Sequence, residues 1–162
     1  MLLYLVRHAF AGQHGDPRYP DDALRPLTKK GRKQFSRMIK RLSRRGFAPT
    51  LVATSPLVRC RQTADVIVER ISPEPELAEQ DSLQPGSLLE ALVAWSNEQG
   101  PEEIAWVGHA PDVDELASAL IGGREGELTF AKGAVAAIRF ADEITIGEGE
   151  LLWFVSPKIL GC

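Results

Sequence analysis

Residues 3–9 read Leu-Tyr-Leu-Val-Arg-His-Ala, a short apolar run that stops abruptly at Arg7-His8. A run of this length and composition predicts a buried β-strand. In an open α/β sheet, ligands bind beyond the carboxyl ends of the strands. The dipeptide would place a permanent cation beside a nucleophilic imidazole at such a strand end, which suits chemistry on a phosphoryl group. By itself it is equally the pattern of a strand that runs out into a polar turn.

Short β-type runs and amphipathic helical segments alternate along the rest of the chain. We expect strands over residues 2–6, 51–54, 76–78, 104–107, 134–140 and 150–155. We expect helices over residues 29–45, 57–70, 87–98 and 112–121. This order predicts a three-layer α/β/α fold with a mostly parallel six-stranded sheet. The last two strands have no helix between them, so one antiparallel strand is expected near an edge of the sheet.

The composition is that of a globular protein, with 162 residues of which 44% are hydrophobic and 25% charged. We therefore expect residues 1–162 to form a single domain. The apolar runs are far shorter than the roughly 20 residues that cross a bilayer. The first run lacks a basic leader and is broken at Arg7, so no signal peptide is expected. Cys60 and Cys162 are the only cysteines, which argues against a disulfide framework or a zinc site and favours the cytoplasm.

The net charge of −3 is unevenly distributed, because residues 29–45 contain nine Lys or Arg and no acid. Phe35, Met38, Ile39 and Leu42 follow helical spacing in this segment, which predicts a basic face toward solvent. That face is either simply solvated or a docking surface for an acidic partner. The pI of about 5.7 argues against a nucleic-acid binder.

Two further segments place chemically active side chains where a strand gives way to a helix. Residues 55–64, SPLVRCRQTA, open a helix whose free N–H groups attract an anion, and Arg59 in its first turn adds a guanidinium. Residues 107–111, VGHAP, end another strand in His109. A parallel sheet would place the strand ends at His8 and His109 side by side. The two histidines are therefore interpreted as one site.

Residues 25–31, RPLTKKG, lead into the basic helix. Thr28 is the expected N-cap, and Arg25 lies either on the surface or over the site. With LVRHA, SPLVRCRQTA and VGHAPD in this order, the chain resembles the histidine phosphatase superfamily, the phosphoglycerate mutase-like fold. The small size and the KGA segment at residues 132–134 look like the SixA-type phosphohistidine phosphatases.

The resemblance implies a metal-independent phosphatase. His8 would attack phosphorus in line and form a phosphohistidine intermediate. Arg7, Arg59 and His109 would surround the phosphoryl oxygens, and Arg25 would be an accessory substrate-binding cation. No metal or other cofactor is expected, because these side chains can neutralise the charge of the transferring group.

The chain departs from the mutase and acid phosphatase branches of the family, which insert a long lid after the third strand that also supplies a general-acid glutamate. Here only about ten residues separate Glu76 from the helix expected near Ser87. Glu79 and Asp81 are the nearby acids, although an imidazole leaving group can carry its own proton. The open site favours phosphohistidine on a signalling or phosphotransfer protein, which the basic helix 29–45 would dock.

Two other functions stay open at this stage: a small-molecule phosphomonoesterase or phosphomutase of the same superfamily, and a non-catalytic phosphoprotein-binding module. Three side chains near the motifs have simpler interpretations. His14 is expected to be solvated, and Cys60 to be a small packing residue. Lys132 either faces the pocket or caps a turn.

Overall fold

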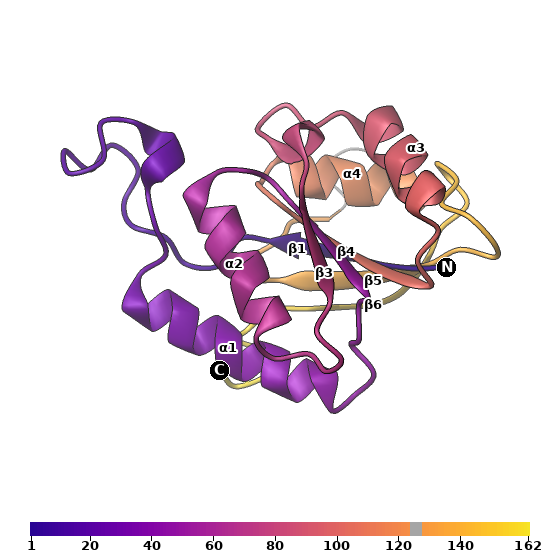
Figure 1. Ribbon diagram of the computed structural model, residues 1–162, viewed down its shortest axis with the longest axis horizontal. Helices are drawn as coiled ribbons and strands as arrows, with labels where there is room; N and C mark the ends of the chain where they lie inside the picture. Colours follow the sequence, from indigo (N-terminus) through magenta and orange to yellow (C-terminus); the bar gives the residue numbers. More distant parts are fainter. Residues whose placement is uncertain (124–127) are drawn as a thin grey trace.

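A mixed six-stranded sheet runs through the middle of the molecule with helices on both of its faces (Figure 1). The computed structural model describes residues 1–123 and 128–162. The strands are β1 (Leu2–Arg7), β2 (Leu51–Thr54), β3 (Glu76–Glu79), β4 (Glu103–Gly108), β5 (Val135–Arg139) and β6 (Glu150–Val155). The α-helices are α1 (Lys29–Ser43), α2 (Val58–Val68), α3 (Leu89–Gln99) and α4 (Asp112–Leu120). Two short 3₁₀ helices, η1 (Asp22–Leu24) and η2 (Asp81–Leu83), lie in the connections.

The strand order is β3-β2-β4-β1-β5-β6. Strands β3, β2, β4 and β1 are mutually parallel, whereas β5 is antiparallel to both of its neighbours. The expected three-layer α/β/α fold, with one antiparallel strand near an edge, is therefore confirmed. In the pairing of β1 with β4, Arg7 lies opposite Gly108. The residues that follow, His8 and His109, consequently leave the sheet next to each other.

Alternate side chains of the strands enter two apolar cores, one on each face of the sheet. The core beneath α1 and α2 includes Tyr4, Val6, Phe35, Met38 and Ile67. The core beneath α3 and α4 includes Leu3, Leu5, Trp106, Leu116 and Leu120. Each large apolar side chain buried in this way stabilises the fold by about 1.5–3 kcal/mol. The two cores together hold the carboxyl ends of the parallel strands in fixed positions.

Several element boundaries differ from the sequence-based prediction for identifiable reasons. Strands β1 and β4 each run one residue beyond the predicted end, so His8 and His109 directly follow hydrogen-bonded strand residues. The helix expected from residue 87 begins at Leu89, because Leu88 is extended and its N–H donates to the Ser82 carbonyl oxygen at 3.0 Å. The N–H groups of Gly86 and Ser87 before it donate to Asp112 Oδ1 at 2.9 and 3.1 Å.

The start of α1 fixes the segment that follows His8. Thr28 is the N-cap, as predicted: its Oγ1 accepts from the Gly31 N–H at 2.9 Å, while its own N–H donates to the Phe10 carbonyl oxygen at 2.9 Å. A Cβ at Gly31 would overlap the Phe10 carbonyl oxygen, so only glycine lets the helix approach this closely. The loop after His8 is thus held against a helix rather than left free.

The connection from β3 to α3 is short and contains only η2 as regular structure. Leu83 of η2 is buried in the core, so this connection packs against the body of the fold. None of the described helices is long and apolar enough to cross a membrane.

Candidate active site

All five residues predicted from the sequence line one cavity at the carboxyl ends of β1 and β4. The cavity has a volume of about 680 Å³. Its lining includes Arg7, His8, Arg25, Arg59 and His109. These side chains come from two strand ends, the first turn of α2 and the loop before α1, so the fold assembles them from segments far apart in the sequence.

His8 presents a neutral imidazole to the cavity. Its Nδ1 lies 2.8 Å from the Ala9 carbonyl oxygen, which can only accept, so Nδ1 carries the proton and Nε2 keeps a lone pair. Burial lowers the pKa of His8 to about 3, helped by the neighbouring His109, Arg59 and Arg7. The His8 N–H donates to the Gly108 carbonyl oxygen at 3.0 Å and fixes the backbone. The residue therefore has a free nucleophilic nitrogen throughout the physiological pH range.

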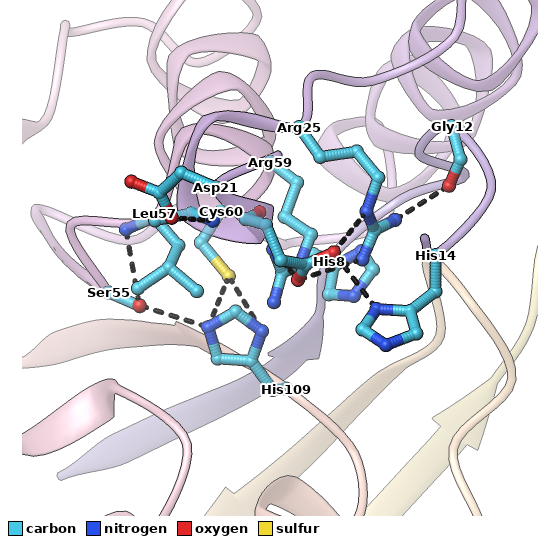
Figure 2. A network of polar contacts seen from close by, with 12 residues as sticks. His8, Gly12, His14, Asp21, Arg25, Ser55, Leu57, Arg59, Cys60 and His109 are labelled. Carbon is cyan, nitrogen blue, oxygen red and sulfur yellow. Dashed lines mark hydrogen bonds and ion pairs between the residues drawn. The ribbon is translucent and has the colours of Figure 1, made fainter. Parts of the chain in front are cut away.

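His109 lies beside His8, with 5.5 Å between the ring centroids. Its Nε2 is 3.0 Å from Ser55 Oγ and 3.4 Å from Cys60 Sγ (Figure 2). Burial and then Arg59 lower the pKa of His109 to about 4. Cys60 is buried, and its pKa is raised to about 12, so it is a protonated packing residue as expected from the sequence. His109 is thus a second neutral imidazole, able to donate one hydrogen bond.

Arg7 and Arg59 each have a buried Nε–H donor without a hydrogen-bond acceptor. Arg7 Nη1 donates to the Phe130 carbonyl oxygen at 2.5 Å, and Arg59 Nη1 donates to the Asp22 carbonyl oxygen at 2.9 Å. Within the part of the chain that the structure describes, Nε of Arg7 and Nε of Arg59 are the buried side-chain nitrogens or oxygens without a hydrogen-bond partner. An unsatisfied buried donor costs about 1–3 kcal/mol, more when it is charged. An anion with several oxygens would satisfy both.

Arg25 lies over the site and not on the surface, which decides between the two alternatives open from the sequence. It is 7% exposed, and its Nη1 donates to the Gly12 carbonyl oxygen at 2.6 Å (Figure 2). Lys132 also lines the cavity, with Nζ 5.0 Å from the Phe10 ring centroid. Burial and the neighbouring Arg7 and Arg25 lower the pKa of Lys132. Three arginines and Lys132 outnumber the two carboxylates of the described lining, Asp22 and Asp112, so the cavity carries a surplus of positive charge.

One cavity residue that the sequence reasoning missed is Asp22. Its carboxylate accepts from Arg25 and lies against Arg59 and His14. Asp22 stands three residues before Arg25, a spacing that could have drawn attention to it. His14 is exposed, as expected, but this contact brings it to the cavity edge.

The two acids considered from the sequence do not line the cavity. Glu79 pairs with Arg61, and Asp81 accepts from the side chain of Gln84. Another residue not singled out is Thr63, whose Oγ1 accepts from the Ala9 N–H at 3.1 Å and donates to the Arg59 carbonyl oxygen at 2.7 Å. Thr63 thereby links the loop after His8 to the helix that carries Arg59.

Over residues 1–123 and 128–162, no group of three or more His, Cys, Asp or Glu side chains is arranged to hold a metal ion. The cavity instead combines a neutral imidazole with an unprotonated nitrogen, arginine donors that lack acceptors, and a surplus of positive charge. This combination can bind a phosphoryl group and attack its phosphorus.

Comparison with known proteins points to one family. A model described as the histidine phosphatase superfamily (branch 1) matches residues 3–112. An uncharacterized protein of Picosynechococcus sp. (strain ATCC 27264 / PCC 7002 / PR-6) is 35% identical over 167 residues, which covers 99% of this chain and 99% of that protein.

Solved structures share the fold over nearly the whole chain. The protein histidine phosphatase SixA complexed with tungstate has a TM-score of 0.85 at 24% identity and covers 99% of both chains. A putative phosphohistidine phosphatase SixA from Agrobacterium tumefaciens has a TM-score of 0.78 at 22% identity, over 96% of this chain and 97% of that one. A putative alpha-ribazole-5'-P phosphatase from Escherichia coli str. K-12 substr. MG1655 has a TM-score of 0.73 at 19% identity, over 97% of this chain and 98% of that one. The fold is therefore phosphoglycerate mutase-like.

The two buried histidines make stability sensitive to acid. We predict that the free energy of unfolding falls as the pH drops from 6.5 toward 4. In the unfolded chain both histidines bind protons near their ordinary pKa of 6.5. In the folded protein burial lowers the pKa to about 3 for His8 and about 4 for His109, so they stay unprotonated over most of this range. Each histidine adds a slope of up to about 1.4 kcal/mol per pH unit within that window.

Urea titrations at a series of pH values measure this dependence. Carboxylates also titrate in the same window, so the readout is the difference between wild type and His8→Asn. Between pH 4 and 6, the unfolding free energy of the variant should change with pH less steeply than that of wild type, by about 1.4 kcal/mol per pH unit, which corresponds to one proton. Identical slopes for the two proteins would show that His8 is not held neutral by burial.

Proposed function

The chain belongs to the histidine phosphatase superfamily, and on that premise we propose that it is a phosphohistidine phosphatase acting on a phosphorylated signalling or phosphotransfer protein. The observation that carries the proposal is the free Nε2 of His8 in a cavity with two buried arginine donors that lack acceptors. The short connection between β3 and α3 supports a protein substrate, because among the described residues it contributes Pro85 alone to the cavity lining.

In the first step, His8 Nε2 attacks phosphorus in line. A new N–P bond forms while the bond between phosphorus and the substrate's imidazole nitrogen breaks. Arg7 Nε and Arg59 Nε donate to the non-bridging oxygens and stabilise the negative charge there. His109 lies beside the reacting group and would become a further donor by exchanging its contact with Ser55 or Cys60 for a phosphoryl oxygen. In this proposal the protein's cations supply the positive charge that a metal ion provides in other phosphatases.

The leaving group decides whether an acid is needed. An oxygen leaving group departs from an ester as an alkoxide and needs a proton, whereas an imidazole protonated on its other nitrogen departs as a neutral molecule. Neither Glu79 nor Asp81 reaches the cavity. In the part of the chain that is described, the carboxylates that do line the cavity, Asp22 and Asp112, accept from Arg25 and from the N–H groups of Gly86 and Ser87. An imidazole leaving group, which needs no acid, fits this arrangement better than a sugar phosphate does.

In the second step, water attacks the phosphorylated His8. The N–P bond breaks, its electron pair returns to Nε2, and inorganic phosphate leaves with the oxygen of the water. The proton of the water passes to the phosphate or to solvent. The bond from Nδ1–H to the Ala9 carbonyl oxygen keeps the same tautomer through both steps, so Nε2 is ready for another cycle.

A small-molecule phosphatase of the same superfamily is the second candidate, because a fold neighbour is named as a putative alpha-ribazole-5'-P phosphatase. A non-catalytic phosphoprotein-binding module is the third. Action as a single domain over residues 1–162 and a cytoplasmic location stay predictions.

The basic face of α1 would dock the acidic protein substrate. Lys33, Arg37 and Lys40 are exposed along this helix, whereas Phe35 and its apolar neighbours are buried as the spacing predicted. Near the start of the helix, Lys30 lines a groove that shares Phe10 with the catalytic cavity. A partner lying on this face could therefore reach the cavity with a phosphorylated side chain.

The central prediction concerns the covalent intermediate. Wild-type protein mixed with a carrier protein labelled on phosphohistidine should itself become labelled, as detected on a denaturing gel after a quench without acid. His8→Asn should carry no label and lose at least about a thousandfold in kcat, because the nucleophile is gone. Cys60→Ala should still be labelled, since its thiol is buried and protonated. Equal labelling and turnover in His8→Asn would refute the mechanism.

The same preparations distinguish the three functions. Phosphohistidine proteins, sugar phosphates and nucleotides are compared by kcat/KM. A clear preference for a sugar phosphate or nucleotide would establish the second function instead, and phosphate binding without turnover on any substrate would establish the third.

Docking on α1 is tested by reversing its charge. The double variant Lys33→Glu, Arg37→Glu should lower kcat/KM for the protein substrate about tenfold at low salt, and the difference should shrink at high salt. Turnover of a small phosphoimidazole is the control and should stay as in wild type, because both side chains lie outside the cavity. An unchanged rate with the protein substrate would show that this face is only solvated.

A further inference from the structure

The carboxylate of Asp22 lies between the side chains of Arg25 and Arg59. Oδ1 accepts from Arg25 Nε at 2.7 Å, and Oδ2 accepts from Arg25 Nη2 at 3.2 Å. Arg59 Nη1 lies 3.1 Å from Oδ2. These cations, Arg25 first, hold the pKa of Asp22 well below its ordinary value. Asp22 is therefore an anion wherever the enzyme works.

This carboxylate takes up two of the five N–H donors that Arg25 could offer to a phosphate. Two guanidinium nitrogens form a fork on Asp22, and the third, Nη1, donates to the Gly12 carbonyl oxygen. One N–H of Nη1 and one of Nη2 are left over, so a phosphoryl oxygen that binds Arg25 must do so beside the negative charge of Asp22. The same anion lies close enough to His109 to favour its protonated form, so its field extends across the cavity.

The arginines have anchors that do not depend on the charge of Asp22. Arg25 and Arg59 are 7% and 5% exposed, so packing restrains both stems. Arg25 keeps its bond to Gly12, and Arg59 Nη1 also donates to the backbone oxygen of Asp22. An asparagine at position 22 would retain that backbone oxygen and one side-chain acceptor. Neutralising the carboxylate should therefore leave both cations in place.

We propose that Asp22 is an internal counter-ion that weakens anion binding in the cavity, so that inorganic phosphate is released after each cycle. The inference rests on the proposed function only in that the ligand is a phosphoryl group. Without Asp22, the cations Arg7, Arg25, Arg59 and Lys132 would face a single carboxylate among the described lining residues, Asp112, and would retain a multiply charged product. Asp22 repels that product while it orients two of the cations.

Binding of inorganic phosphate, followed by calorimetry without any turnover, tests the proposal. Asp22→Asn should bind phosphate about tenfold more tightly than wild type, with an advantage that declines as salt is added. In steady state the variant should show stronger product inhibition and a lower KM, with no gain in kcat.

Asp16→Asn is the matched control. It makes the same change of charge in the same loop, but Asp16 pairs with the exposed Arg18 and does not line the cavity. Its phosphate affinity should stay within about twofold of wild type. Asp22→Ala, which removes the same charge, serves as the second variant if Asp22→Asn does not fold.

Unchanged or weaker phosphate binding in folded Asp22→Asn would overturn the proposal, because a carboxylate that only holds the arginines gives that result. An equal gain in Asp16→Asn would overturn it too, since the effect would then follow net charge alone. Failure of the labelling experiment on His8 would refute the catalytic mechanism and leave this binding comparison intact.

Discussion

The parallel pairing of β1 with β4 is the constraint on which the site depends. The two strands are in register with Arg7 opposite Gly108, and the N–H of His8 donates to the Gly108 carbonyl oxygen. A shift of one residue would turn the side chains of either strand to the opposite face of the sheet. Both faces of these strands are buried in separate cores, so the register is fixed. His8 and His109 therefore lie side by side, just beyond the carboxyl ends of the two strands.

That rigid frame allows the site to hold groups that are costly to bury. Arg7 and Arg59 each keep a buried Nε without an acceptor, and each such donor costs about 1–3 kcal/mol. Both imidazoles are held neutral by the same burial. Cores on both sides of the sheet offset these costs before any ligand arrives. A phosphoryl group that satisfies the donors would therefore bind a preorganised site, with little rearrangement left for the reaction itself.

The parts of the site that could be predicted from the sequence are those at the ends of periodic segments. His8, Arg59 and His109 were placed because each follows a recognisable strand or opens a recognisable helix. Asp22 was missed because the loop around it has no periodicity and Arg59, one of its partners, lies on α2; the three-residue spacing to Arg25 was the local signal. The start of α3 was misplaced for a related reason, since contacts outside the helix, from Leu88 to Ser82 and from Gly86 and Ser87 to Asp112, hold the residues before it in a non-helical conformation.

A crystal structure of the chain with vanadate tests most directly whether these groups form one phosphoryl-transfer site. Vanadate adopts the trigonal bipyramidal geometry of in-line attack at phosphorus. We predict vanadium bonded to His8 Nε2, with equatorial oxygens about 2.7–3.1 Å from Arg7 Nε and Arg59 Nε. Vanadate bound elsewhere, or seated in the cavity while both Nε atoms still lack an acceptor, would contradict the assignment.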